Sequence, residues 1–402
     1  MFRRSIEAVG NRPNVYCQCI GRLFSEVMMP LLTCLIFLLL LPFPAFSAKA
    51  SERIYYIAAD EVIWDYAPSA PINPIVAQPF TNAEKIYING GDTRIGHSYI
   101  KAVYRAYTDA SFKTLKVRAP EERYLGILGP IIHAEVGDTI KVVFRNNTHL
   151  ALGIHPHGVR YDKSSEGAHY ATGNGSPEPG AAGTAATIET GAHVLPGNEY
   201  TYHWNVPEQA GPGPLDPDSI VWLYHPHDHE SVDIYTGLVG AIVVTRAGHA
   251  KPDGTPKDVD RELFVLFMIF DENLSPYLRA NIKRFAGTPG GVQLEADDFK
   301  ESNKKHALNG FIYGNLDGLT MRRNQRVRWY LLALGNEDDV HTAHWHGNTV
   351  LRHGSRTDTV GLLPALTEVV DMKPYNPGVW MFHCHVADHM AAGMMTRYTV
   401  TE

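Results

Sequence analysis

The chain has 402 residues, of which 44% are hydrophobic and 10% aromatic, and it carries a formal net charge of −7. This composition excludes a disordered chain and a collagen-like repeat, and the four cysteines are too few for a fold held together by disulfides. The acidic balance argues against nucleic acid as a partner and favours small cations, whose local concentration a negative surface raises.

Residues 1–50 have the order of a targeting segment, with a basic stretch, an apolar run over 28–46 and small residues at 48–50. This order is typical of a cleaved secretory signal, so we expect an exported protein, periplasmic or extracellular. The alternative is an uncleaved membrane anchor, because the apolar run approaches the length of a membrane span. Cys384 is the one cysteine beyond this segment, and metal ligation is a leading explanation for a lone thiol in an exported protein.

Strand patterns dominate the rest of the chain. Apolar and polar residues alternate over 139–144 and over 326–331, which predicts strands in sheets with one buried face. Helical periodicity is confined to 275–285.

Two stretches rich in turn residues interrupt these patterns. Residues 247–260 predict a linker between a domain over 51–246 and a second over 261–402. Residues 164–198 predict a long loop, either functional or a simple surface insertion.

The two halves of the chain repeat each other. His155-Pro156-His157-Gly158 matches His344-Trp345-His346-Gly347, and Trp222-Leu223-Tyr224-His225-Pro226-His227 matches Trp380-Met381-Phe382-His383-Cys384-His385. The repeat indicates one ancestral β-sandwich unit that has been duplicated.

Four His-X-His pairs result from this duplication. Side chains at i and i+2 of a strand share a face, so each pair presents two imidazoles to one side. A single pair would fit a mononuclear zinc site or two ordinary polar residues. Four pairs in duplicated positions favour a cluster of about three copper, zinc or iron ions, since eight imidazoles exceed what one ion can use. The eight are His155, His157, His225, His227, His344, His346, His383 and His385.

Cys384 lies between two of these histidines, and its sulfur is expected on the opposite face of the strand. His341, His389 and Met394 lie nearby in sequence, with Met395 as a competing thioether. One cysteine, two histidines and a weak axial methionine form the ligand set of a blue copper centre. Electrons could then reach the histidine cluster through a few covalent bonds.

The first half lacks this second set of ligands. Leu152, Pro226 and Ser231 stand where the second half has His341, Cys384 and His389. We therefore expect a mononuclear centre in the second half only, with the cluster shared between one domain of each type.

These motifs, in this order, resemble those of the multicopper oxidase family, and within it the ceruloplasmin- and hephaestin-like ferroxidases. The stretches that carry the closer resemblance are 124–130, 134–138, 301–306 and 335–341. The resemblance implies an all-β fold of two cupredoxin-like Greek-key β-sandwich domains and four copper ions per catalytic unit: one type 1, one type 2 and two type 3.

The resemblance also implies a role for each ligand. Type 1 copper would be held by His341, Cys384, His389 and Met394, and type 2 copper by His155 and His344. The type 3 pair would take His157, His225 and His385 on one ion, and His227, His346 and His383 on the other. Cys384, His383 and His385 would carry the catalytic electron transfer.

In these ferroxidases iron is held beside the type 1 copper by carboxylates and a histidine. The matching residues here are Glu301, His306 and Asp388, with Glu337 supplied across a subunit boundary. The implied reaction oxidises Fe(II) to Fe(III) and reduces dioxygen to water. Two-domain relatives imply a homotrimer with the three-copper cluster at the subunit interface.

Three alternatives remain open from the sequence. A two-domain laccase would oxidise phenolic donors, and a copper nitrite reductase would need fewer cluster histidines. The third alternative is an exported copper-binding or electron-transfer protein that catalyses no reaction. Glu230 or Asp228 is a candidate for relaying protons to oxygen.

Overall fold

The computed structural model describes residues 50–170 and 191–402. All but the last residue of the predicted targeting segment 1–50, and the middle of the predicted loop 164–198, lie outside the described residues. Within the described ranges, no helix has the length and apolar character needed to span a membrane.

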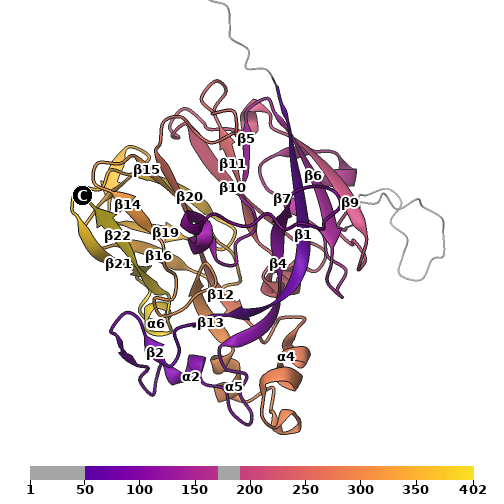
Figure 1. The fold of residues 1–402 in the computed structure, drawn as a ribbon, viewed down its shortest axis with the longest axis vertical. Coiled ribbons are helices and arrows are strands. Elements are labelled where there is room, and N and C mark those ends of the chain that lie inside the picture. The colour runs from indigo at the N-terminus through magenta and orange to yellow at the C-terminus, as the bar shows by residue number, and fades with distance from the viewer. Residues whose placement is uncertain (1–49, 171–190) are drawn as a thin grey trace, which may run out of the picture. The chain divides into compact units, whose positions relative to one another are not determined.

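Two sheets precede the predicted linker and form the first sandwich (Figure 1). Their strand orders are β4-β1-β6-β9-β8 and β5-β11-β10-β7. The bounds are β1 Glu52–Asp65, β4 Ser98–Tyr107, β5 Ile132–Glu135, β6 Thr139–Asn146, β7 His155–Pro156, β8 Arg160–Tyr161, β9 Glu199–Asn205, β10 Ser219–His225 and β11 Gly240–Thr245.

Two further sheets follow the linker and form the second sandwich. Their orders are β13-β12-β15-β20-β17-β18 and β14-β22-β21-β16-β19. The bounds are β12 Arg261–Asp271, β13 Lys304–Leu308, β14 Thr320–Arg322, β15 Val327–Ala333, β16 His341–Trp345, β17 Val350–Arg352, β18 Ser355–Thr357, β19 Thr359–Leu362, β20 Thr367–Met372, β21 Gly378–Cys384 and β22 Met395–Thr401. The predicted all-β class and the duplicated β-sandwich are confirmed.

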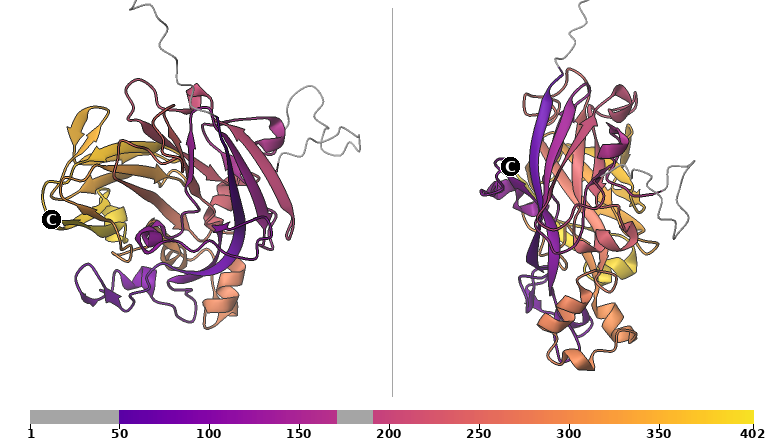
Figure 2. Two further views of the ribbon diagram at one scale, coloured as in Figure 1. Left: turned by 45° about the horizontal axis from the view of Figure 1, so that its top comes forward. Right: turned by 90° about the vertical axis from the view of Figure 1, so that its right-hand side faces the viewer.

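Helices are short and peripheral, and those between residues 278 and 302 gather at one end of the fold (Figure 2). The longest α-helix among residues 50–170 and 191–402 is α4, which lies inside the predicted range 275–285. The helices are α2 Lys85–Ile88, α3 Glu230–Asp233, α4 Leu278–Phe285, α5 Asp297–Ser302 and α6 Ala387–Ala391, and a small hairpin joins β2 Ile72–Asn73 to β3 Gln78–Pro79.

The predicted alternation is confirmed in β6 and wrong in β15. In β6, Ile140, Val142 and Phe144 are fully buried and the intervening residues are half-exposed. In β15 every residue is buried. The second face of β15 packs against the first sandwich, where Arg328 reaches Ser219 Oγ at 2.7 Å and Tyr330 reaches the same oxygen at 2.7 Å.

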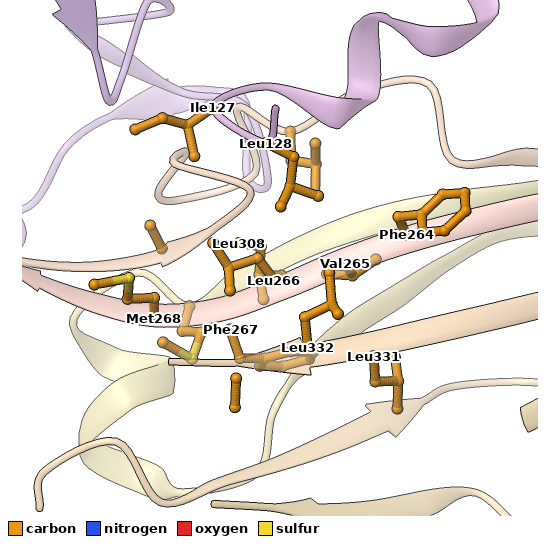
Figure 3. Packing of buried hydrophobic residues seen from close by; sticks show 14 of the residues in the cluster. Ile127, Leu128, Phe264, Val265, Leu266, Phe267, Met268, Leu308, Leu331 and Leu332 are labelled. Atoms are coloured by element: carbon orange, nitrogen blue, oxygen red, sulfur yellow. The ribbon is translucent and has the colours of Figure 1, made fainter. Parts of the chain in front are cut away.

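Hydrophobic side chains from both sandwiches share one core cluster, part of which is drawn in Figure 3, and the first sandwich has a second cluster largely of its own. Phe267 and Leu332 of the second sandwich lie in the same cluster as Ile127 and Leu128 of the first. Burying each such side chain contributes about 1.5–3 kcal/mol. Because the core is shared, the domain limits at 51–246 and 261–402 stay a prediction, although no described sheet crosses residues 247–260.

The segment between β1 and β4 belongs to the first half of the sequence but covers the second sandwich. Trp64 Nε1 donates to the carbonyl of Gly310 at 2.6 Å, and the amide of Ile312 donates to the carbonyl of Tyr66 at 3.0 Å. These bonds place α2 beside α5, as Figure 1 shows.

Candidate metal centres

The mononuclear site is formed by three elements of the second sandwich. Strand β16 begins with His341, β21 ends with Cys384, and α6 carries His389. Cys384 Sγ lies 3.9 Å from Nδ1 of His341 and 3.8 Å from Nδ1 of His389, and the two ring nitrogens are 3.2 Å apart. All three side chains are buried. The structure therefore brings together three of the four residues predicted for type 1 copper.

A buried carboxylate orients one of these rings, and sequence reasoning missed it. Asp339 Oδ1 lies 3.1 Å from Nε2 of His341 and accepts the amide of Ile269 at 2.7 Å. With Nε2 bonded to Asp339, Nδ1 is left to face the sulfur. The strand rule could not identify it, because Asp339 lies in the turn before β16, where the i, i+2 spacing does not fix the face of a side chain.

Met394 is buried beside the same site, while Met395 is half-buried. The amide of Met394 donates to the carbonyl of His389 at 2.9 Å, and its carbonyl accepts the amide of Cys384 at 3.0 Å. Met395 pairs with His383 in the register of β21 and β22, and neighbouring strand residues face opposite sides. Met394 is the better placed of the two methionines.

The equivalent position in the first sandwich is apolar. Leu152 is fully buried in the core of that sandwich, and Pro226, which matches Cys384 in the repeat, is also buried. Ser231, in register with His389, is exposed. Within the described ranges, the only His/Cys group of the mononuclear type lies in the second sandwich.

Four histidines of the first sandwich form the first half-site, which comprises His155, His157, His225 and His227. Nε2 of His157 lies 2.9 Å from Nε2 of His225, and the rings of His155 and His227 are 4.8 Å apart. Nδ1 of His155 donates to the carbonyl of Glu166 at 2.6 Å. A carbonyl bond at Nδ1 leaves Nε2 with its lone pair directed into the half-site.

The second half-site, which comprises His344, His346, His383 and His385, repeats these contacts. Nε2 of His346 lies 3.1 Å from Nε2 of His383, and Nδ1 of His344 lies 2.9 Å from the carbonyl of Asp358. Nδ1 of His383 lies 2.8 Å from the carbonyl of Cys384, as Nδ1 of His225 lies 3.0 Å from that of Pro226. The duplication seen in the sequence thus extends to the hydrogen bonds that fix the ring orientations.

The glycine that ends each His-X-His-Gly motif has a structural reason. Gly158 and Gly347 both have a φ of +72°, a left-handed conformation that favours glycine. A Cβ at Gly158 would meet the ring of Trp222 at 2.1 Å, and one at Gly347 would meet Trp380 at 2.4 Å. The tryptophans that open the second motif of each half therefore cover the glycines of the first.

Burial keeps the central imidazoles neutral, which is the state that binds a metal. Burial, and to a smaller extent the neighbouring His157, lowers the pKa of His225 to about 3. Burial, and to a smaller extent the neighbouring His155, lowers the pKa of His157 to about 4. In the second half-site burial also lowers the pKa of His346 and His383.

The two half-sites do not meet within one chain. Among residues 50–170 and 191–402, no ring contact or hydrogen bond joins a histidine of one half-site to a histidine of the other. The predicted type 3 pairs His157–His225 and His346–His383 are brought together. The predicted type 2 pair, His155 and His344, is not brought together, nor is His385 with the first half-site or His227 with the second.

Three of the four predicted iron residues gather beside the mononuclear site. The ring of His306 lies 5.3 Å from the ring of His389, and Asp388 precedes His389 in α6. Glu301 is the penultimate residue of α5, shortly before β13, the strand that carries His306. Burial lowers the pKa of His306 to about 3, and its Nδ1 atom is buried without a hydrogen-bond partner. Glu337 is exposed on the loop after β15. In the part of the chain that the structure describes, it forms no hydrogen bond or ion pair with the other three predicted iron residues.

The two predicted proton-relay acids differ in position. Glu230 Oε2 lies 2.9 Å from Nε2 of His227, and Oε1 lies 3.8 Å from Nε2 of His225, so this carboxylate borders the first half-site. The hydrogen bond from His227 lowers the pKa of Glu230 to about 2. Asp228 instead accepts Nδ1 of His193 at 2.5 Å.

Comparisons with family models, curated proteins and solved structures all point to the same family. Two models described as multicopper oxidase match residues 125–248 and 288–402. Human ceruloplasmin is 43% identical over 353 residues, which are 87% of this chain and 32% of the relative. The human protein named ferroxidase HEPHL1 is 40% identical over 351 residues, 87% of this chain and 29% of that protein. The chain thus spans about a third of the length of these relatives. A solved structure titled multicopper oxidase has a TM-score of 0.53 at 18% identity, covering 87% of this chain and 89% of the other, which supports the same fold.

Proposed function

This chain belongs to the multicopper oxidase family, and from that premise we propose that it oxidises Fe(II) to Fe(III) with dioxygen as the electron acceptor. The observation that carries the proposal is the gathering of Glu301, His306 and Asp388 beside His389. Carboxylates are hard ligands that favour Fe(III) over Fe(II), so such a group of residues lowers the iron potential and favours loss of an electron.

The donor sets fit copper. The mononuclear site offers a cysteine sulfur and two imidazoles within 3.9 Å of one another. Each half-site offers imidazoles whose rings are held by backbone carbonyls. Copper, when bound, supplies one-electron transfer at the mononuclear site and four-electron reduction of dioxygen at the three-ion cluster. The proposed type 1, type 2 and type 3 ligands are those given above.

The chain itself provides the connection between substrate and cluster. The ring of His306 is 5.3 Å from the ring of His389. Cys384 is covalently joined to His383 and His385, so a short covalent path links the mononuclear site to the second half-site. Glu230 accepts a hydrogen bond from Nε2 of His227, so its ionised carboxylate borders the first half-site.

We further propose that the cluster is completed between subunits of a homotrimer. Support comes from the separation of the half-sites within one chain, because each lacks four imidazoles that another copy would supply. A head-to-tail contact that closes on itself meets this need. The segment matched in ceruloplasmin is 32% of that protein, so three copies would span about its full length. In the trimer Glu337 would come from the neighbouring subunit.

Cellular export and the domain limits 51–246 and 261–402 are part of the same proposal. The alternatives differ in electron donor or in turnover. A laccase would oxidise phenols without needing Glu301, and a copper protein without turnover would consume no oxygen. A nitrite reductase would not need eight cluster histidines.

Oxygen uptake by the purified, copper-loaded protein tests the proposal. Fe(II) should support rapid uptake that falls in Glu301→Ala, while a phenolic donor should be oxidised at the same rate by both proteins. Equal loss with both donors, or no effect on Fe(II), would overturn the assigned substrate.

A further inference from the structure

Tyr87 lies at the centre of the proposed iron residues, although it comes from a distant part of the sequence. It is in α2, and its hydroxyl donates a hydrogen bond to Oε1 of Glu301 in α5. Its ring meets the ring of His306 edge-on, with centroids 5.9 Å apart and planes at 80°. Among its electrostatic neighbours are Glu301 and Asp388. One side chain thus touches two of the iron residues and lies near the third.

We propose that Tyr87 is a positioning residue of the substrate site, which holds the Glu301 carboxylate in place beside His306 to receive Fe(II). The inference rests on the proposed function. A free glutamate side chain loses rotamer freedom when it is fixed, and this loss opposes cation binding. A hydrogen bond present before the cation arrives removes part of that cost, because the carboxylate is already oriented.

The tyrosine is itself held in place by a buried cation. Lys305 is fully buried, and its Nζ donates to the carbonyls of Tyr87 at 2.6 Å, Ser302 at 2.7 Å and Gly96 at 2.8 Å. Ser302 directly follows Glu301, so one ammonium group ties the backbone of the tyrosine to the backbone beside the carboxylate. Figure 1 shows the two short helices, α2 and α5, next to each other.

The geometry favours positioning over electron transfer through the tyrosine. His306 is already 5.3 Å from His389 between ring centroids, so electrons have a route that does not pass through Tyr87. Loss of the hydroxyl should therefore weaken cation binding and leave the later electron transfer unchanged.

The test is Tyr87→Phe in the full copper-loaded protein, since phenylalanine keeps the ring against His306 and removes only the hydroxyl. We expect KM for Fe(II) to rise about tenfold, as for loss of one hydrogen bond to a charged group, with kcat nearly unchanged. Zn(II) is a cation that undergoes no oxidation, and its affinity, measured by calorimetric titration, should fall by a similar factor. Phenol oxidation and the blue absorbance should be unaffected.

Two further variants make the outcomes separable. Tyr107→Phe removes a comparable bond, from a tyrosine to Asp60 Oδ2 at 2.8 Å, far from the iron residues in the fold, and should change neither quantity. Unchanged KM and Zn(II) affinity in Tyr87→Phe, with Glu301→Ala impaired, would overturn the positioning role alone. A fall in kcat at constant KM would also overturn it, in favour of electron transfer through Tyr87. An unimpaired Glu301→Ala would overturn the substrate site and this proposal together.

Discussion

Sγ of Cys384 lies 3.8 Å from Nδ1 of His389, although the two residues belong to different elements, the end of β21 and the helix α6. The chain reverses direction within the five residues between them, which brings both side chains together in a buried site. A soft thiolate beside an imidazole, away from water, is the environment that gives copper its blue colour and tuned potential.

Replacing Cys384 with serine should therefore abolish the blue absorbance of the copper-loaded protein. The fold should survive, because serine is nearly the same size and the site is surrounded by a large core. Visible absorption and thermal unfolding followed by circular dichroism check both points. A blue band retained in Cys384→Ser would refute the ligand assignment.

The two adjacent methionines provide a matched pair of variants. Met394→Leu should raise the reduction potential of the mononuclear copper, because it removes the weak axial donor that stabilises the oxidised ion. Met395→Leu should leave the potential unchanged, since Met395 faces the other side of its strand. Redox titration of the blue band measures both, and the reverse ranking would exchange the roles of the two residues.

Assembly between subunits can be tested by mixing two inactive variants. His157→Ala damages the first half-site, and His346→Ala damages the second, so each protein alone should consume no oxygen. Subunits co-expressed in equal amounts should recover about a quarter of the wild-type activity, because random head-to-tail pairing leaves that share of interfaces intact.

A cluster contained within one chain would behave differently in this experiment. Mixed assemblies would then stay inactive, because every chain carries one damaged half-site. Light scattering on the wild-type protein provides the control, with a mass three times that of the chain expected and a monomer contradicting the proposal.

A buried ion pair joins the two sandwiches and should matter for stability. Lys101 and Glu272 are both fully buried and are paired with each other, and the lysine also donates to the carbonyl of Tyr235 at 2.7 Å. Glu272→Gln should lower the free energy of unfolding by about 3–5 kcal/mol, because it leaves a buried charge without its partner. Denaturant unfolding measures this loss.

Two controls accompany that variant. Glu295→Gln removes an exposed pair with Lys300 and should have no measurable effect on stability. The double variant Lys101→Met with Glu272→Leu should recover most of the lost stability, because no unpaired charge remains. A single variant as stable as the wild type would mean that the lysine finds another partner.

The sequence predicted what local spacing controls. The His-X-His pairs and the alternation in β6 follow from strand geometry, and both appear in the structure. Contacts between distant segments left no such pattern. The bond from Tyr87 to Glu301 joins residues 214 positions apart, and the burial of Arg328 depends on a surface supplied by the other sandwich. Asp339 was missed because it lies in the turn before β16, where no spacing rule predicts which way a side chain points.

The most direct test of the central claim is the ratio of iron oxidised to oxygen consumed by the copper-loaded protein. The proposed reaction is 4 Fe(II) + O2 + 4 H+ → 4 Fe(III) + 2 H2O, so simultaneous measurement of Fe(III) and dissolved oxygen should give four irons per oxygen, without peroxide, after correction for uncatalysed oxidation. A ratio of two with accumulation of hydrogen peroxide, or no uptake above the uncatalysed rate, would contradict the account.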